Sequence, residues 1–283
     1  MKKLILLYAL VVEWIYIDIL FAQNNKPYHV NTSSIDLVLK DSSLKSTKNR
    51  TIPLIQIKIS KNINHKFYIQ GCLHANELTA CKFVTWLANK VINGDSLLNQ
   101  LNTAQLDFVP IANPDGFVLK QRYNFKDVNL NRNFSMFWGI SFEPHGTHPF
   151  SEKETLALNK LLTYQKYDAA IDVHGFANLI ITPSITSELE KTSLLTPKYF
   201  SWIKILKTVM QKILWSHYKI KSALELKDGG AFEDWAFWEN NTLAFCLELN
   251  YKNRFTNNED TFLRYENFIY QIFQQLINNK DVI

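Results

Sequence analysis

The chain has 283 residues, of which 47% are apolar and 20% are charged, and its formal net charge is +5. This composition excludes a largely disordered chain, because the apolar surface is large enough to offset the conformational entropy lost on folding. The lysines are scattered along the chain and form no cluster with interleaved aromatic residues, so the sequence indicates no nucleic-acid partner.

The first 22 residues have the layout of a secretory signal peptide. Two lysines precede nine consecutive apolar residues, 4–12, and Ala22 is an acceptable cleavage site. Glu13 and Asp18 argue against a stable membrane span, which needs ~20 residues with few charges. We therefore expect a protein that is exported to the periplasm or secreted, with an uncleaved N-terminal helix as the alternative.

Strand and helix patterns alternate along one domain, 51–283, which follows a polar lead-in segment, 23–50. The alternation predicts an α/β fold with a mixed, largely parallel central sheet and helices on both faces. Functional sites in such sheets lie beyond the carboxyl ends of the strands. The expected elements, in chain order, are strands at 52–59 and 67–71, a helix at 77–92, a strand at 106–111, a helix from a capping box at 151–154 to about 162, a strand at 169–173, a helix at 199–215, a strand at 243–249 and a helix at 261–276.

The three cysteines, Cys72, Cys81 and Cys246, have no metal-finger spacing, and their odd number argues against a full disulfide framework. Cys72 and Cys246 lie in strand-like apolar runs, which favours buried thiols that pack as small apolar side chains. One disulfide is left open for an exported protein.

A histidine and a glutamate follow the strand at 67–71 and open the next helix. His74 and Glu77 stand at i and i+3, so both side chains can point to one spot. His174 follows the strand at 169–173 and completes a His₂Glu set, the ligand composition of a catalytic zinc site with one position left for water. Considered without each other, the His74–Glu77 pair could be a surface salt bridge, and His174 could be a hydrogen-bonded loop residue.

Three further polar residues could act on a substrate. Asn131 and Arg132 offer an amide beside a guanidinium, which could hold a carboxylate by two hydrogen bonds, although a structural arginine is the alternative. Glu248 lies within an apolar strand, where a carboxylate is costly unless it has a partner or a function. Near a zinc-bound water it could serve as the general base.

Together, these residues resemble the zinc carboxypeptidases typified by pancreatic carboxypeptidase A and B. The resemblance covers about 52–249, and each of its motifs is modest alone, but their order is that of the family. The motifs are His74-x-x-Glu77, Asn113-Pro114-Asp115-Gly116, Asn131-Arg132-Asn133-Phe134, Phe150-Ser151-Glu152-x-Glu154-Thr155, His174, Gly229-Gly230 with Asp234-Trp235, and Glu248.

The resemblance implies a zinc carboxypeptidase fold, of the compact bacterial type, for the catalytic domain. It implies one Zn²⁺ per chain, bound by His74, Glu77 and His174, with Glu248 as the general base.

The resemblance also implies how a substrate is bound. Asn131 and Arg132 would hold its terminal carboxylate. Arg122, nine residues before Asn131, falls where short bacterial members of the family place the arginine that stabilises the oxyanion.

Three departures from the family pattern affect the site. The family usually has an aspartate, oriented toward a zinc-ligand histidine, where this chain has Asn129, which could weaken zinc binding. The tyrosine that normally precedes the Gly-Gly pair is missing from 224–228. One extra residue follows that pair, so the residue of the specificity pocket is Phe232 if counted forward from the Gly-Gly pair and Glu233 if counted back from the Asp-Trp pair. We favour Glu233 because the Asp-Trp pair should fix the local alignment with the family better than a Gly-Gly loop.

The implied function is that of a zinc metallocarboxypeptidase that hydrolyses the C-terminal amide bond of a peptide. Two other hydrolases stay open: a murein-peptide carboxypeptidase or amidase that releases diaminopimelate, and an aspartoacylase-like deacylase of N-acyl amino acids, which shares a first motif like 74–79. A binding module that has kept the fold without catalysis is the non-enzymatic alternative. The expected partner is a peptide or murein peptide with a free carboxylate.

Overall fold

The computed structural model describes residues 44–250 and 259–279. The predicted signal peptide and most of the predicted lead-in segment lie outside the described residues. Within the described residues, no helix is both long enough and apolar enough to cross a membrane.

Seven strands form one sheet in the order β1-β3-β2-β4-β7-β5-β6. Its four central strands are parallel: β3 (Ala104–Val109), β2 (His65–Gly71), β4 (Ala169–Gly175) and β7 (Leu243–Leu249). The other three strands flank them: β1 (Ile55–Lys58) runs antiparallel to β3, β5 (Leu179–Thr182) runs antiparallel to β7, and β6 (Lys219–Ser222) is parallel to β5. The predicted mixed, largely parallel sheet is therefore confirmed.

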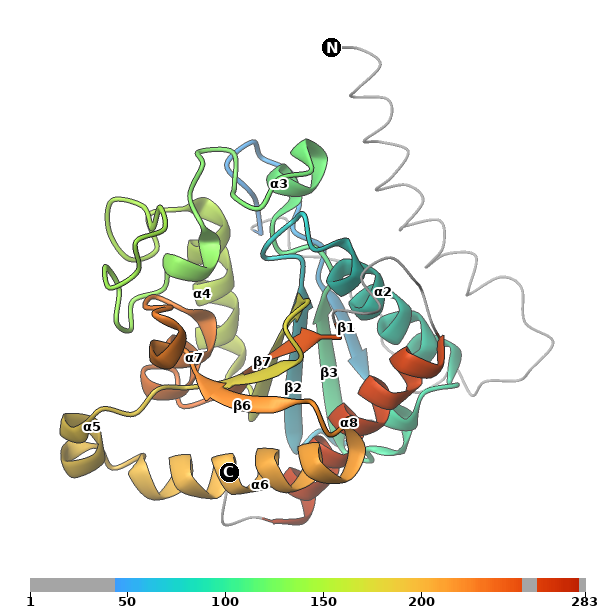
Figure 1. The fold of residues 1–283 in the computed structure, drawn as a ribbon. Coiled ribbons are helices and arrows are strands. Elements are labelled where there is room, and N and C mark those ends of the chain that lie inside the picture. Colours follow the sequence, from blue (N-terminus) through green and yellow to red (C-terminus); the bar gives the residue numbers. More distant parts are fainter. Residues whose placement is uncertain (1–43, 251–258, 280–283) are drawn as a thin grey trace, which may run out of the picture.

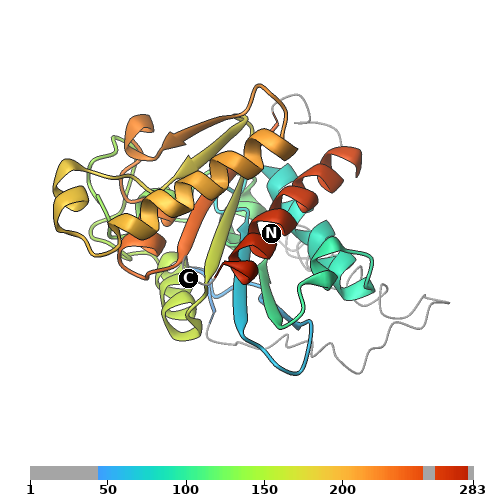
Figure 2. The same cartoon turned by 90° about the horizontal axis from the view of Figure 1, so that it is seen from below.

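Helices cover both faces of the sheet (Figures 1 and 2). One face packs on α2 (Leu78–Asn93), α6 (Thr196–Ile213) and α8 (Glu259–Asn278), and the other on α4 (Lys153–Gln165) and α7 (Phe232–Trp238). Side chains alternate between these two cores, as a strand requires: Ile69 and Ile171 lie in the first core, and Tyr68 and Ala170 in the second. The short elements α3 (Pro114–Leu119), α5 (Ser187–Thr192), η2 (Leu97–Gln100), η3 (Leu130–Arg132) and η4 (Leu224–Leu226) lie in the connections.

The expected capping box of α4 is wrong. The helix begins at Lys153, and no side chain caps its first turn. The Ser151 hydroxyl instead accepts a hydrogen bond from the Asn133 side chain at 2.9 Å. Glu154 accepts from the backbone N–H of Thr47 at 2.9 Å and from its hydroxyl at 3.2 Å. Both residues of the box thus bind segments distant in the sequence, and these tertiary bonds replace the local ones.

The carboxyl ends of the central strands lie at one edge of the sheet, and β2 and β7 both flank β4 there. Helix α2 packs closely against β2 at this edge because Gly71 has no side chain. A Cβ atom at Gly71 would lie 2.9 Å from the Val84 side chain and 3.0 Å from the Ala80 carbonyl oxygen. The chain therefore turns directly from the end of β2 into α2, and that turn carries His74 and Glu77.

Candidate active site

His74 and Glu77 lie in the turn between β2 and α2. The Glu77 N–H donates to the His74 carbonyl at 3.1 Å, which closes the turn, and Glu77 immediately precedes the first residue of α2. Both side chains are buried, and Nδ1 of His74 lies 3.1 Å from Oε1 of Glu77. The structure therefore brings the imidazole and the carboxylate together, as the i, i+3 spacing predicted.

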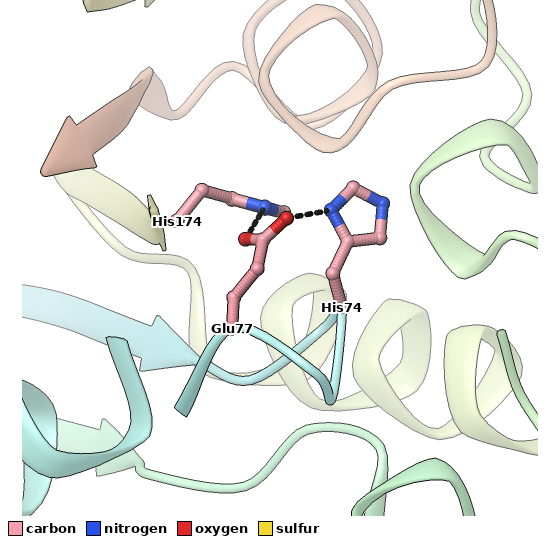
Figure 3. A group of neighbouring side chains, drawn as sticks. All are labelled: His74, Glu77 and His174. Atoms are coloured by element: carbon pink, nitrogen blue, oxygen red, sulfur yellow. Dashed lines mark hydrogen bonds and ion pairs between the residues drawn. The ribbon is translucent and has the colours of Figure 1, made fainter. Parts of the chain in front are cut away.

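His174 reaches the same carboxylate from strand β4. Its Nδ1 lies 3.0 Å from Oε2 of Glu77, so each carboxylate oxygen faces one histidine (Figure 3). One possible ligand atom from each of His74, Glu77 and His174 lies within 4.8 Å of the other two. Two imidazole nitrogens and one carboxylate are a donor set that suits catalytic zinc.

The second ring nitrogen of each histidine faces a hydrogen-bond acceptor. Nε2 of His74 lies 2.9 Å from Oδ1 of Asn129, and Nε2 of His174 lies 2.7 Å from Oδ2 of Asp172. An acceptor there keeps the ring proton on Nε2 and leaves the Nδ1 lone pair for a metal ion. The donor set and its outer partners therefore fit zinc.

Asp172 was not singled out from the sequence. It is fully buried in β4, two residues before His174 and on the same face of the strand. A carboxylate inside an otherwise apolar strand is costly without a partner, and this was the signal that could have found it.

The charges in this cluster favour a cation. Burial alone would raise the pKa of Glu77, but the two neighbouring histidines outweigh it and the pKa is lowered. Burial alone would lower the pKa of His174, yet the carboxylates of Asp172 and Glu77 raise it well above its usual value. Burial lowers the pKa of His74. The Glu77 carboxylate thus places negative charge where the two Nδ1 atoms meet, and the Asp172 carboxylate adds negative charge on the far side of the His174 ring.

Glu248 lies next to this cluster on β7. It is the register partner of His174 across the β4–β7 pair, so both side chains stand on the same face of the sheet. Its Oε2 accepts the backbone N–H of Phe176 at 2.9 Å. Burial, and then the charge of Glu77, raise the pKa of Glu248 to about 7. A carboxylate with such a pKa is suited to accept a proton near neutral pH.

Arg122 borders the cluster from the loop after α3. Its Nη1 lies 3.0 Å from Nδ1 of His74 and 3.2 Å from Oε1 of Glu77. The side chain is 31% exposed. The guanidinium therefore stands between solvent and the atoms that would surround a metal ion, where it can stabilise negative charge.

Arg132 is held by internal carboxylates, and the sequence did not predict these partners. Its Nη2 donates to Asp228 and lies 3.3 Å from Oε2 of Glu143, while Nε donates to Ser141 Oγ at 3.2 Å. Nη1 donates to the Asn131 carbonyl at 2.7 Å. A buried guanidinium needs such partners. A bound carboxylate would have to replace one of them.

Asn131 lies beside Arg132 in η3 and faces the start of α7. Its Oδ1 accepts the backbone N–H of Phe232 at 2.9 Å. This bond leaves the Nδ2 group as the part of the side chain that can donate to a ligand. The structure thus brings together Asn131, Arg132 and the first residues of α7.

The structure separates the two residues that the sequence left open for the specificity pocket. Phe232 is fully buried in the second core, with its ring 6.3 Å from that of Tyr68 and 5.5 Å from that of Phe134. Glu233 is also buried, but its Oε2 has no hydrogen-bond partner among the residues that the structure describes. Burial, and then the charge of Asp234, raise the pKa of Glu233 well above its usual value.

Two of the three cysteines form a disulfide. Cys72 and Cys81 are bonded, with their Cα atoms 5.0 Å apart, and Cys246 is free and buried. The favoured interpretation of Cys72 as a buried thiol in a strand is therefore wrong, because β2 ends at Gly71 and Cys72 lies in the following turn. The disulfide brackets the turn that carries His74 and Glu77.

Sequence comparison finds similarity to known proteins. A family model described as zinc carboxypeptidase matches residues 28–278. Carboxypeptidase A2 of Rattus norvegicus is 25% identical over 174 residues, which cover 52% of this chain and 42% of that protein. Carboxypeptidase B of Helicoverpa zea is 24% identical over 182 residues, with the same coverage of each chain. The matches thus span about two fifths of the length of these relatives.

Solved structures share the fold. The crystal structure of thrombin-activatable fibrinolysis inhibitor matches with a TM-score of 0.69 and 18% identity, over 95% of this chain and 73% of that chain. A metallo-carboxypeptidase of Burkholderia cenocepacia matches with a TM-score of 0.66 and 16% identity, over 93% and 68%. The murein-tripeptide amidase of Escherichia coli O157 matches with a TM-score of 0.54 and 19% identity, over 82% and 91%. The predicted carboxypeptidase-like fold is thereby confirmed.

Proposed function

The chain belongs to the zinc carboxypeptidase family, and on this premise we propose that it hydrolyses the C-terminal amide bond of a peptide that has a free carboxylate. The observation that carries this proposal is the convergence of one possible ligand atom from each of two histidines and one carboxylate within 4.8 Å, next to a glutamate whose pKa is raised to about 7. The predicted zinc cofactor is confirmed for the family, and its binding by these side chains is part of the proposal.

His74, Glu77 and His174 would hold the zinc ion. When bound, zinc supplies a Lewis acid that polarises water and a carbonyl group. Asn129 and Asp172 bind Nε2 of the two rings, which leaves each Nδ1 directed toward Glu77, where the ion would bind. Glu248 would take the proton of the attacking water and later give it to the leaving amine. The exposed side of the site is bordered by Arg122, which would stabilise the negative charge that develops on the carbonyl oxygen.

Asn131 and Arg132 would bind the terminal carboxylate of the substrate. Arg132 already contacts the carboxylates of Asp228 and Glu143, which supports a role in binding a carboxylate. Burial raises the pKa of Asp228 despite the neighbouring Arg132. Asp228 is therefore the partner that gives up its charge more readily, and a substrate carboxylate would take its place.

The experiment that tests this function compares matched peptides that end in a free acid or an amide. Loss of a charge-assisted hydrogen bond costs ~1.5–3 kcal/mol, so kcat/KM should fall by about 10- to 150-fold on amidation. The released C-terminal residue is measured by mass spectrometry. Equal rates on the two forms, or cleavage inside the peptide, would contradict a carboxypeptidase. Hydrolysis of N-acyl amino acids alone would favour the deacylase alternative.

A second candidate substrate is a murein peptide, which would be cleaved by the same reaction. The buried Glu233 is the residue that favours it. Glu233 is buried, carries an unpartnered oxygen and lies in α7, at whose start Asn131 binds the backbone. An unpaired buried charge is costly, which is why burial raises the pKa of Glu233, and a cationic side chain in the leaving residue would pair with the carboxylate and favour its ionised form. Lysine, arginine and the amino end of diaminopimelate all meet this requirement.

We also propose that the protein is exported. The signal-like pattern of the first 22 residues motivates this, and the Cys72–Cys81 disulfide supports it, because disulfides persist in oxidising compartments. N-terminal sequencing of the mature protein tests the proposal and should give a start near residue 23. An intact Met1 would contradict cleavage.

A further inference from the structure

Asn129 stands where the family usually has an aspartate, and its surroundings compensate for the change. Its side-chain Oδ1 lies 2.9 Å from Nε2 of His74 and accepts the backbone N–H of Asn131 at 2.9 Å. Its Nδ2 donates to the carboxylate of Glu143. Asn129 is fully buried, so these are the contacts that decide how its amide lies.

The amide of Asn129 can turn so that it no longer accepts a hydrogen bond from His74, whereas a carboxylate accepts in either orientation. An aspartate presents an acceptor to His74 in either orientation, whereas an asparagine presents an acceptor in one orientation and a donor in the other. A donor facing Nε2 would require that nitrogen to accept, which moves the ring proton to Nδ1. Nδ1 is the atom that faces Glu77, and a protonated Nδ1 has no lone pair for a metal ion.

Two partners hold the amide in the orientation that zinc binding needs. The Asn131 N–H can only donate, and the ionised Glu143 carboxylate can only accept. Turning the amide over would face two donors toward each other at Asn131 and two acceptors toward each other at Glu143. Both arrangements are unfavourable, because the Asn131 contact is buried and the Glu143 contact is partly buried.

Glu143 is itself fixed and kept ionised. Its Oε1 lies 3.4 Å from Nε of Arg122, and its Oε2 lies 3.3 Å from Nη2 of Arg132. Burial opposes ionisation, but the two arginines outweigh it and lower the pKa of Glu143. The loop is also fastened to Asn129 through the backbone, because the Asn129 N–H donates to the carbonyl of Pro144 at 2.8 Å.

From these contacts we infer that Glu143 is a positioning residue of the metal site: it fixes the Asn129 amide, and through it the ring tautomer of His74. The inference rests on the proposed role of His74 as a zinc ligand. It assigns a function to a loop glutamate that lies 14 residues after Asn129 and touches no proposed ligand itself.

The test measures the dissociation constant for zinc by competition with a chromogenic chelator, which does not depend on catalysis. Glu143→Leu removes the acceptor and should weaken zinc binding by ~10- to 100-fold, the usual effect of losing an outer partner of a metal ligand. Glu143→Gln keeps an acceptor oxygen for Nδ2 and should stay within a few-fold of wild type. Adding Asn129→Asp to Glu143→Leu should restore the wild-type affinity, because either oxygen of an aspartate can accept the hydrogen bond from Nε2 of His74.

Asp228→Asn is the matched control. It removes the other carboxylate on Arg132 without touching Asn129, so its zinc affinity should equal that of wild type. Unchanged affinity in Glu143→Leu, or no rescue by Asn129→Asp, would overturn the inference. If wild type itself binds no zinc, the proposed function fails and not merely this inference.

A second measurement keeps the inference testable if Glu143→Leu does not fold. Nitrogen-15 NMR of the metal-free wild-type protein reports the imidazole tautomer of His74. The proton should be on Nε2 in wild type and in Glu143→Gln. A proton on Nδ1 in the wild-type protein would contradict the mechanism.

Discussion

A buried carboxylate has to be held by hydrogen bonds or by positive charge, because an unpartnered buried charge is costly. Glu77 has two histidines, and Asp172 has one. Glu248 and Glu233 are different, because burial raises the pKa of each. Raised carboxyl pKa values gather at functional sites. These two glutamates are therefore where we expect single substitutions to alter activity without unfolding the protein.

Glu248→Gln should leave zinc content unchanged and reduce kcat by ~10²- to 10⁴-fold, because the amide cannot take a proton from the attacking water. In wild type, kcat/KM should fall as the pH drops through the pKa of Glu248, since the protonated carboxyl cannot act as a base. Bound zinc draws that pKa downward from about 7 toward the ordinary 4.5, so the acid limb should lie between these values. Steady-state kinetics against pH measures both effects. Full activity in Glu248→Gln would remove the residue from the mechanism.

Glu233→Gln should change substrate preference. Wild type should cleave peptides ending in lysine faster than those ending in leucine, and the substitution should reduce the Lys/Leu ratio of kcat/KM by about 10-fold or more, the value of one charge-assisted hydrogen bond. Glu188→Gln, the same substitution at an exposed position of α5, is the control and should leave the ratio unchanged. A wild-type preference for leucine would show that the pocket is not acidic.

At the scale of elements, the turn between β2 and α2 is the most constrained part of the site. It is fastened by the Cys72–Cys81 disulfide, by the bond from the Glu77 N–H to the His74 carbonyl, and by the close packing at Gly71. Three constraints of different kinds thus act on the segment 71–81. The turn can therefore present both side chains in one fixed arrangement before a metal ion binds, which lowers the entropy cost of binding.

Replacing both Cys72 and Cys81 with serine should lower the free energy of unfolding by about 2.5 kcal/mol, the chain-entropy value for a loop of this length. The change is measured by urea denaturation of the variant and of wild type under oxidising conditions. The same measurement with a reducing agent is the control, since the difference between the two proteins should then largely disappear. An equal stability under oxidising conditions would show that the disulfide does not form in solution.

At the scale of the whole molecule, the candidate zinc site joins separate parts of the fold. Its side chains come from the turn after β2, from β4 and, through Asn129, from the segment before η3. A ligand that binds only the folded state stabilises it by mass action. Zinc should thus stabilise the entire domain and not only the turn.

Removing zinc with a chelator should lower the melting temperature of wild type by about 5–10 °C. This follows from ~2.7 kcal/mol at a free zinc concentration 100 times the dissociation constant, and from ~2–4 °C per kcal/mol for a domain of this size. His174→Ala should bind no zinc in elemental analysis, and its melting temperature should not respond to the chelator. Stoichiometric zinc in that variant would contradict the ligand assignment.

The sequence by itself determined the order of the main elements and the identity of the proposed ligands. Apolar runs of strand length and apolar residues at helical spacing are local signals, so β2, β4, β7 and the four long helices were predicted to within a few residues at most ends. β5 and β6 were missed because they are short flanking strands of the sheet. The histidines and glutamates were identified because few residue types bind zinc, and because they follow predicted strands.

Only the tertiary structure decided which partners the polar groups take. The Cys72–Cys81 bond, the replacement of the α4 capping box, and the contacts of Arg132 with Asp228 and Glu143 all join residues whose pairing no local pattern encodes. The burial of Phe232 in the second core was likewise visible only in the tertiary structure. The physical reason is that propensity acts over a few neighbouring residues, whereas a buried hydrogen bond or ion pair depends on which distant segments the packed core brings into contact.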